Sequence, residues 1–139
     1  MRRFVLTLLF LLTASVAHAY VLTPPECRFG KLLPCLQSGK LEYVVIYNTI
    51  QYEDYADIKE IADNLPKDKP FPTVYLQSLG GSLDAGYGIG KIFRKHSVTV
   101  RSGNPITGDR YSKCISACVI IAAGATKRYL NHIGIHSPA

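Results

Sequence analysis

From Leu41 onward the sequence alternates between two hydrophobic periods, and this alternation most strongly constrains the fold. Segments rich in β-branched and aromatic residues alternate with segments whose apolar residues recur at helical spacing. The predicted strands are 41–50, 73–77, 97–101, 129–130 and 133–135, and the predicted helices are 52–65, 83–95 and 115–123. Such alternation is typical of parallel strands joined by right-handed helical crossovers. We therefore expect an α/β domain with a parallel β-sheet and right-handed βαβ crossovers.

The predicted helix of residues 83–95 has a clear start and an unusual apolar face. Ser82 is its expected N-cap, because a serine hydroxyl can accept a hydrogen bond from the first turn. Gly86 and Gly90 lie on the apolar face, at a cost in helix propensity of ~1 kcal/mol each. We expect these glycines to let the helix approach the sheet closely.

The first nineteen residues have the three parts of a secretory signal peptide. Arg2 and Arg3 precede an apolar run that ends at Leu12, and Ala17-His18-Ala19 fits the cleavage pattern. The run is shorter than the ~20 residues of a membrane span, which argues against the alternative of an uncleaved anchor. We expect a periplasmic or secreted protein without a membrane span in the mature chain. Its predicted parts are 1–19, the signal peptide; 20–40, an irregular lead-in; and 41–139, the α/β domain.

The charge of the chain gives no sign of a nucleic-acid partner. Loss of Arg2 and Arg3 with the signal peptide leaves 14 basic and 10 acidic residues, a net charge of +4. The basic residues are spread out, without the stripe that nucleic-acid binding requires. Glu53 and Asp54 suit the positive end of the predicted helix 52–65, and we interpret both as solvated.

Four cysteines in an exported chain favour disulfide bonds over metal or redox chemistry. Three pairings are available to four cysteines, and the spacing favours Cys27 with Cys35 and Cys114 with Cys118. The first bond would staple the segment of residues 20–40. The second would brace the turn that carries Ser116, and it requires a non-helical start to that segment.

A zinc site is the competing interpretation of the second cysteine pair. Cys114, Cys118, His132 and His136 have the spacing C-x3-C-x13-H-x3-H, within the range of structural zinc sites. The intervening residues, however, begin with an apolar run typical of a core, and an oxidising compartment favours disulfides. We therefore expect no metal and no cofactor.

Gly80 and Gly81 follow a predicted strand and open a helix, where backbone N–H groups can hold an anion. A dinucleotide site would need G-x-G-x-x-G, which this stretch lacks. A phosphate loop ending at Gly90-Lys91 would need a glycine in place of Ala85 and a hydroxyl in place of Ile92. An oxyanion hole is the remaining functional interpretation, and a tight turn without a ligand is the structural alternative.

Ser116 and His136 together indicate acyl-transfer chemistry. Ser116 lies at the start of the predicted apolar helix, and alone it would be interpreted as an N-cap or packing residue. His136 follows a short predicted strand, and alone it would be interpreted as a structural histidine. As a pair they can serve as nucleophile and base, with the N–H of Ala117 as a second oxyanion donor beside the glycine turn.

Between residues 75 and 136 the sequence contains YLQSLGGS, then CISAC, then GIH. This series resembles the Clp protease proteolytic subunit and crotonase superfamily, and looks most like its exported bacterial branch with a Ser-Ala-Cys segment. The resemblance covers about residues 41–139. It implies that Ser116 attacks a peptide carbonyl with His136 as base, and that Gly81 and Ala117 bind the oxyanion.

The sequence departs from that family at the glycine turn and at its end, and also in length: the loop before Ser116 is longer and the segment between Ser116 and His136 is shorter. The usual Ser-Pro-Gly-Gly is Ser78-Leu79-Gly80-Gly81 here, and the family's third triad member lies well beyond the histidine, whereas this sequence ends at Ala139. The resemblance therefore implies a domain that is incomplete at its C-terminus. A histidine without its orienting carboxylate can lose a factor of ~10⁴ in turnover. We predict a peptidase-like serine hydrolase acting on a peptide or protein; the alternative is an inactive binding or assembly module of the cell envelope, and the oligomeric state is open.

Overall fold

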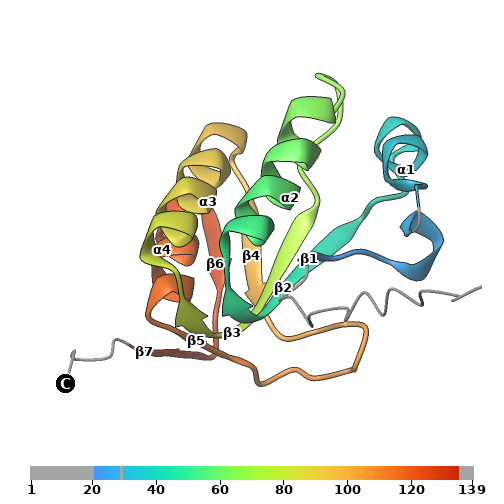
Figure 1. The fold of residues 1–139 in the computed structure, drawn as a ribbon. Coiled ribbons are helices and arrows are strands. Elements are labelled where there is room, and N and C mark those ends of the chain that lie inside the picture. The colour runs from blue at the N-terminus through green and yellow to red at the C-terminus, as the bar shows by residue number, and fades with distance from the viewer. Residues whose placement is uncertain (1–20, 29, 135–139) are drawn as a thin grey trace, which may run out of the picture.

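The computed structural model describes residues 21–28 and 30–134, which form a mixed α/β fold with a largely parallel sheet (Figure 1). The strand order is β1-β2-β3-β4-β6, and β5 pairs with both β3 and β7. Every pair is parallel except β1 with β2. The strands are β1 (Val21–Leu22), β2 (Tyr43–Ile50), β3 (Thr73–Gly81), β4 (Thr99–Ser102), β5 (Lys113–Ile115), β6 (Lys127–Tyr129) and β7 (His132–Gly134). The helices are the 3-10 helix η1 (Pro25–Cys27) and the α-helices α1 (Leu32–Ser38), α2 (Tyr52–Asn64), α3 (Leu83–His96) and α4 (Ala117–Gly124).

The parallel α/β class predicted from the hydrophobic periods is confirmed. Helices α2, α3 and α4 lie side by side along the sheet (Figure 1), and their apolar residues join the strands in one core. The largest fully buried side chains are Phe93, Leu36, Ile46, Ile50, Ile58, Ile61, Leu76, Ile89 and Ile121. Within residues 21–28 and 30–134, no helix is long and apolar enough to cross a membrane.

Glycines on α3 allow close packing, but against α4 rather than against the sheet as predicted. A Cβ added to Gly86 would lie 2.9 Å from the Ala117 carbonyl oxygen. A Cβ added to Gly124 would lie 2.1 Å from the Gly90 carbonyl oxygen, so larger residues are excluded at both crossings. This contact fixes the start of α4, and with it the turn that carries Ser116, against the body of the domain.

The prediction of an irregular lead-in is wrong for residues 32–38, which form α1. Pro34 suggested a break, but it lies in the first turn of α1, where the missing N–H has no intrahelical acceptor in any helix. The predicted pair Cys27 and Cys35 is at disulfide distance, with an S–S separation of 2.14 Å, and joins η1 to α1.

Asp54 is fully buried, so its interpretation as a solvated residue is wrong. Its Oδ2 accepts a hydrogen bond from the Gln51 N–H at 2.7 Å, and the Gln51 side chain caps α2 in return. The other carboxylate oxygen, Oδ1, has no hydrogen-bond partner in the described part of the chain. Burial raises the pKa of Asp54 from 3.8 to about 6. The capping box turns this acid inward, which its position in an acidic first turn did not indicate.

Candidate active site

Ser116 occupies a sharp turn between β5 and α4. Its backbone dihedrals are φ 56° and ψ −121°, a sparsely populated conformation for a residue with a side chain. Its N–H donates to the Gly134 carbonyl at 2.9 Å, and its side chain is half-buried. Although Ser116 stands at the N-cap position, its side chain makes no capping hydrogen bond. In α/β-hydrolases, a strained serine between a strand and a helix exposes a nucleophilic hydroxyl.

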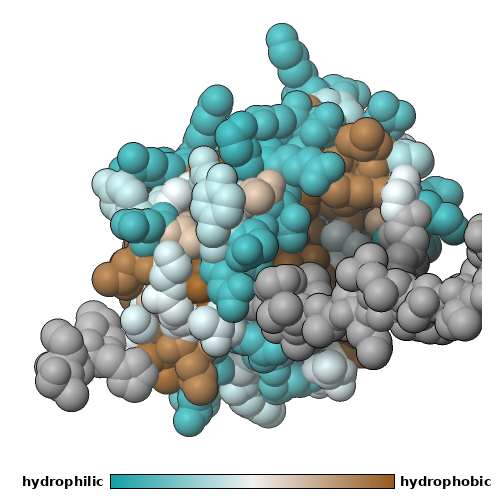
Figure 2. Space-filling view, viewed as in Figure 1, coloured by the Kyte–Doolittle hydropathy of each residue, from teal (hydrophilic) through white to brown (hydrophobic). Residues whose placement is uncertain are grey.

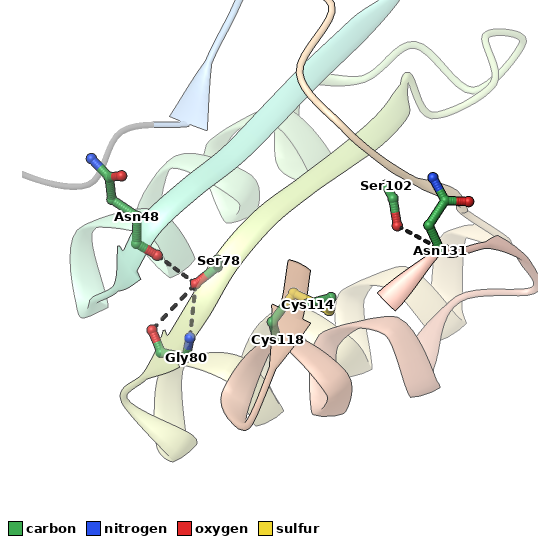
Figure 3. The surroundings of a disulfide bond; sticks show 7 residues. All are labelled: Asn48, Ser78, Gly80, Ser102, Cys114, Cys118 and Asn131. Atoms are coloured by element: carbon green, nitrogen blue, oxygen red, sulfur yellow. Dashed lines mark hydrogen bonds between the residues drawn. A yellow bond between two sulfur atoms is a disulfide. The ribbon is translucent and has the colours of Figure 1, made fainter. Parts of the chain in front are cut away.

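The predicted pair Cys114 and Cys118 encloses this turn. Their sulfur atoms are 2.12 Å apart, and both residues are fully buried (Figure 3). Cys114 lies in β5, so the segment starts as a strand, as a bridge across four residues requires. Engagement of both sulfur atoms in one bond agrees with the disulfide interpretation of this pair. Among the described residues, no group of three or more His, Cys, Asp or Glu side chains is placed to hold a metal ion.

The glycine pair lies directly beside Ser116. Strand β3 continues through Gly81 instead of breaking before it, with φ 114° at Gly80 and 143° at Gly81. A Cβ added to Gly80 would lie 2.7 Å from the Ser116 Cβ and 3.2 Å from its Oγ. A Cβ added to Gly81 would lie 2.4 Å from the Ile50 carbonyl oxygen. Glycine is therefore required at both positions, and residues 36 positions apart in the sequence meet at one edge of the sheet.

The three predicted oxyanion donors differ in their hydrogen bonding. The Gly80 N–H donates to the Ser78 hydroxyl at 3.1 Å, so it is engaged inside the turn. Ala117 is the first residue of α4, where an N–H has no intrahelical acceptor, and the positive end of the helix dipole adds to its attraction for an anion. Gly81 and Ala117 thus remain the candidate donors, and Gly80 shapes the turn between them.

His136 lies outside the described residues. Strand β7 runs parallel to β5, with Gly134 in register with Ile115, the residue before Ser116. Its last described residue is therefore next to the candidate nucleophile, and His136 follows two positions later in the sequence. The placement of His136 as the base stays a prediction.

Residues 103–112 form a loop that connects β4 to β5 along the edge of the sheet (orange in Figure 1), and sequence reasoning assigned this loop no role at the site. Asp109 anchors it, accepting hydrogen bonds from Gln77 Nε2 at 2.8 Å, Ser112 Oγ at 3.0 Å and the Tyr111 N–H at 2.9 Å. The bond from the Tyr111 N–H, with those from the two side chains, holds the pKa of Asp109 below its usual value. Gly103, Pro105 and Gly108 indicate a loop here, but no local signal names its partner on β3.

This loop and the ends of β2 and β3 enclose a cavity of about 630 Å³. The lining includes Ser78 and Leu79, so the cavity begins one residue before Gly80. Leu79 and Ile133 are exposed apolar side chains on the strands at this edge. Apolar surface is visible at the lower left of Figure 2, over the region of β5 and β7 in Figure 1. The cavity thus has both polar and apolar lining residues and lies on the side of the glycine turn formed by the 103–112 loop.

The fold is similar to two solved structures of ClpP1 from Listeria monocytogenes. A point mutant of ClpP1 matches with a TM-score of 0.55 and 23% identity, over 76% of this chain and 62% of that chain. Another ClpP1 structure matches with a TM-score of 0.50 and 25% identity, over 68% of this chain and 49% of that chain. This chain thus spans 62% and 49% of the two ClpP1 chains. The sequence matches no protein-family model and no curated protein.

The similarity defines the class of fold. The chain has a ClpP-like α/β fold, as the family resemblance implied. At this level of sequence identity, the comparison establishes similarity of fold only.

Proposed function

We propose that this protein is a peptidase-like serine hydrolase that works in the periplasm or outside the cell. The observation that carries the proposal is the strained, uncapped Ser116, held against the Gly80 backbone at the edge of a ClpP-like sheet. Strain of this kind costs ~1–3 kcal/mol and persists where the surrounding structure enforces it, which is common at active sites. An ordinary N-cap serine would need neither the positive φ nor the glycine beside it.

In the proposed reaction the Ser116 Oγ attacks the carbonyl carbon of a peptide bond, and its proton passes to His136. The oxyanion of the tetrahedral intermediate accepts hydrogen bonds from the N–H groups of Gly81 and Ala117. Collapse of the intermediate breaks the C–N bond, and the leaving amine takes the proton from the imidazolium. Water then hydrolyses the acyl-enzyme by the reverse sequence of proton transfers.

The position of His136 in the chain supports its role as base. Gly134 accepts a hydrogen bond from the Ser116 N–H, and two further residues of extended chain span at most ~7 Å. This short separation in the chain is the basis on which we assign His136 as the base. The two cysteine pairs at disulfide distance support export, because such bonds persist in oxidising compartments.

A fluorophosphonate probe tests the proposal, because it reacts with activated serine hydroxyls. We expect wild-type protein with intact disulfides to be labelled at Ser116, as mapped by mass spectrometry of the labelled peptide. Ser116→Ala should abolish labelling and His136→Ala should slow it by at least ~100-fold. Ser82→Ala, a matched change at a neighbouring helix start, should leave the rate unchanged. A folded wild type that is not labelled would overturn the hydrolase assignment and favour the inactive envelope module.

A further inference from the structure

We propose that Ser78 is a positioning residue that holds the oxyanion turn in place; this inference rests on the proposed function of Ser116. Ser78 lies in β3, two residues before Gly80, and is only 3% exposed. The hydrolase mechanism assigns it no role, and the sequence alone gave it none.

The Ser78 hydroxyl joins two irregular stretches of backbone (Figure 3). It donates a hydrogen bond to the Asn48 carbonyl of β2 and accepts one from the Gly80 N–H at 3.1 Å. The β2–β3 register runs from Tyr47 paired with Gln77 to Thr49 paired with Gly80, so β3 carries one extra residue here, opposite Asn48, whose φ is 61°. One buried hydroxyl thus ties Asn48 of β2 to the bulge and the glycine turn of β3.

This connection determines which N–H groups remain available to a substrate. With its N–H held by Ser78, Gly80 keeps a fixed orientation, and the following peptide carries the Gly81 N–H. The bond to Asn48 also holds β2 two residues before Ile50, whose carbonyl accepts from the Ser82 N–H at 2.9 Å and closely approaches Gly81. Ser78 therefore acts on both sides of Gly81, the candidate donor beside Ser116, without contacting a substrate itself.

Ser102 offers a matched control. It is also a serine in the sheet, 9% exposed, and its hydroxyl accepts a backbone hydrogen bond from the Asn131 N–H at 3.0 Å (Figure 3). Ser102→Ala therefore makes the same chemical change in β4, and it leaves the Asn131 N–H without its partner instead of the Gly80 N–H of the glycine turn. A general loss of stability should affect both variants, whereas a loss of oxyanion geometry should affect Ser78→Ala alone.

The test measures the second-order rate constant of fluorophosphonate labelling at Ser116 in wild type, Ser78→Ala and Ser102→Ala, each confirmed as folded by circular dichroism. We expect Ser78→Ala to be slower than wild type by about 10- to 100-fold, less than the loss of a whole oxyanion donor. Ser102→Ala should stay within about 3-fold of wild type, a bound below the effect of one lost donor. Ser78→Thr keeps the hydroxyl, and we expect it to restore most of the rate.

A folded Ser78→Ala that reacts as fast as Ser102→Ala would overturn this inference while leaving the hydrolase assignment intact. A wild type that does not react at all would overturn both, so the two failures are distinguishable. If Ser78→Ala does not fold, Ser78→Cys and Ser102→Cys carry the comparison, because a thiol is of similar size but is a weak donor and acceptor. Ser78→Cys should again be the slower of the two, and equal rates would refute the positioning role.

Discussion

Ser82 and Ser116 stand at equivalent places in two neighbouring junctions, each directly before the first residue of a helix. Ser82 has ordinary dihedrals, φ −63° and ψ 118°, and its hydroxyl accepts a hydrogen bond from the Ala85 N–H at 3.2 Å. Ser116 has φ 56° and ψ −121°, and makes no capping bond. One residue type therefore serves two purposes at the same point of the fold. The first serine stabilises its helix, and the second keeps its hydroxyl free at a cost in backbone strain.

Gly80→Ala should destabilise the protein most, because it forces apart the turn before α3 and the turn before α4. The new Cβ would lie 2.7 Å from the Ser116 Cβ at a residue with φ 114°. Overpacking and positive φ together predict a loss of about 3 kcal/mol in the free energy of unfolding, measured by denaturant titration. Labelling of Ser116 should fall as well, because the turn that carries Gly81 must shift.

Gly108→Ala is the control for that substitution. Gly108 also has a positive φ, 77°, but a Cβ added there would have nothing within 4 Å. It should lose only the cost of the backbone conformation, about 1 kcal/mol, and label normally. If the two variants lose the same free energy of unfolding, the contact between Gly80 and Ser116 is not tight. The glycine turn would then not be packed against Ser116.

Ser116→Gly and Ser82→Ala should change stability in opposite directions. Glycine adopts positive φ without strain, so Ser116→Gly should stabilise the fold by about 1 kcal/mol while abolishing labelling. Ser82→Ala should cost about 1 kcal/mol through the lost cap and keep labelling. Thermal unfolding and probe reactivity measure the two effects separately. A destabilised Ser116→Gly would show that Ser116 supports its helix as Ser82 does.

The sequence predicted features that depend on local pattern and composition. The parallel class, the α3 boundaries within one or two residues, the Ser82 cap and both cysteine pairs could be inferred, because each follows from periodicity, capping preference or spacing. The features it missed depend on contacts between distant segments. Gly86 and Gly90 were correctly identified as packing positions, but the partner is α4, and no local signal distinguishes a helix from a sheet as the neighbour.

For the candidate site, the sequence likewise indicated one feature and missed another. The convergence of the Gly80 turn and Ser116 was inferred from the order of strands and helices, and the contact between Gly80 and Ser116 agrees with it. The engagement of the Gly80 N–H by Ser78 could not be inferred, because it depends on the bulge of β3 opposite Asn48. Bulges arise from pairing between strands, so a single segment does not reveal them.

A third strand-to-helix junction joins β2 to α2 and contains a buried acid, Asp54. It gives the smallest expected change in stability. Asp54 has a folded-state pKa of about 6 against 3.8 when unperturbed, because burial disfavours its charge. Between these values the folded protein binds more protons than the unfolded chain, so its contribution to stability falls as the pH rises from about 4 to about 6. Asp54→Asn keeps an oxygen for the Gln51 N–H and removes the buried charge. We expect it to stabilise the protein on the order of 1 kcal/mol at pH 7.

The pH dependence separates this effect from a general change in packing. The advantage of Asp54→Asn over wild type should shrink towards pH 4, where the wild-type carboxyl is protonated in the folded protein. Glu53→Gln removes a charge from the same first turn at an exposed position, and should show no such trend. An Asp54→Asn variant that is less stable than wild type at pH 7 would mean that the ionised carboxylate caps α2 more strongly than burial opposes it. In that case the β2–α2 junction would resemble the Ser82 junction, and Ser116 would be the one strained start among the three.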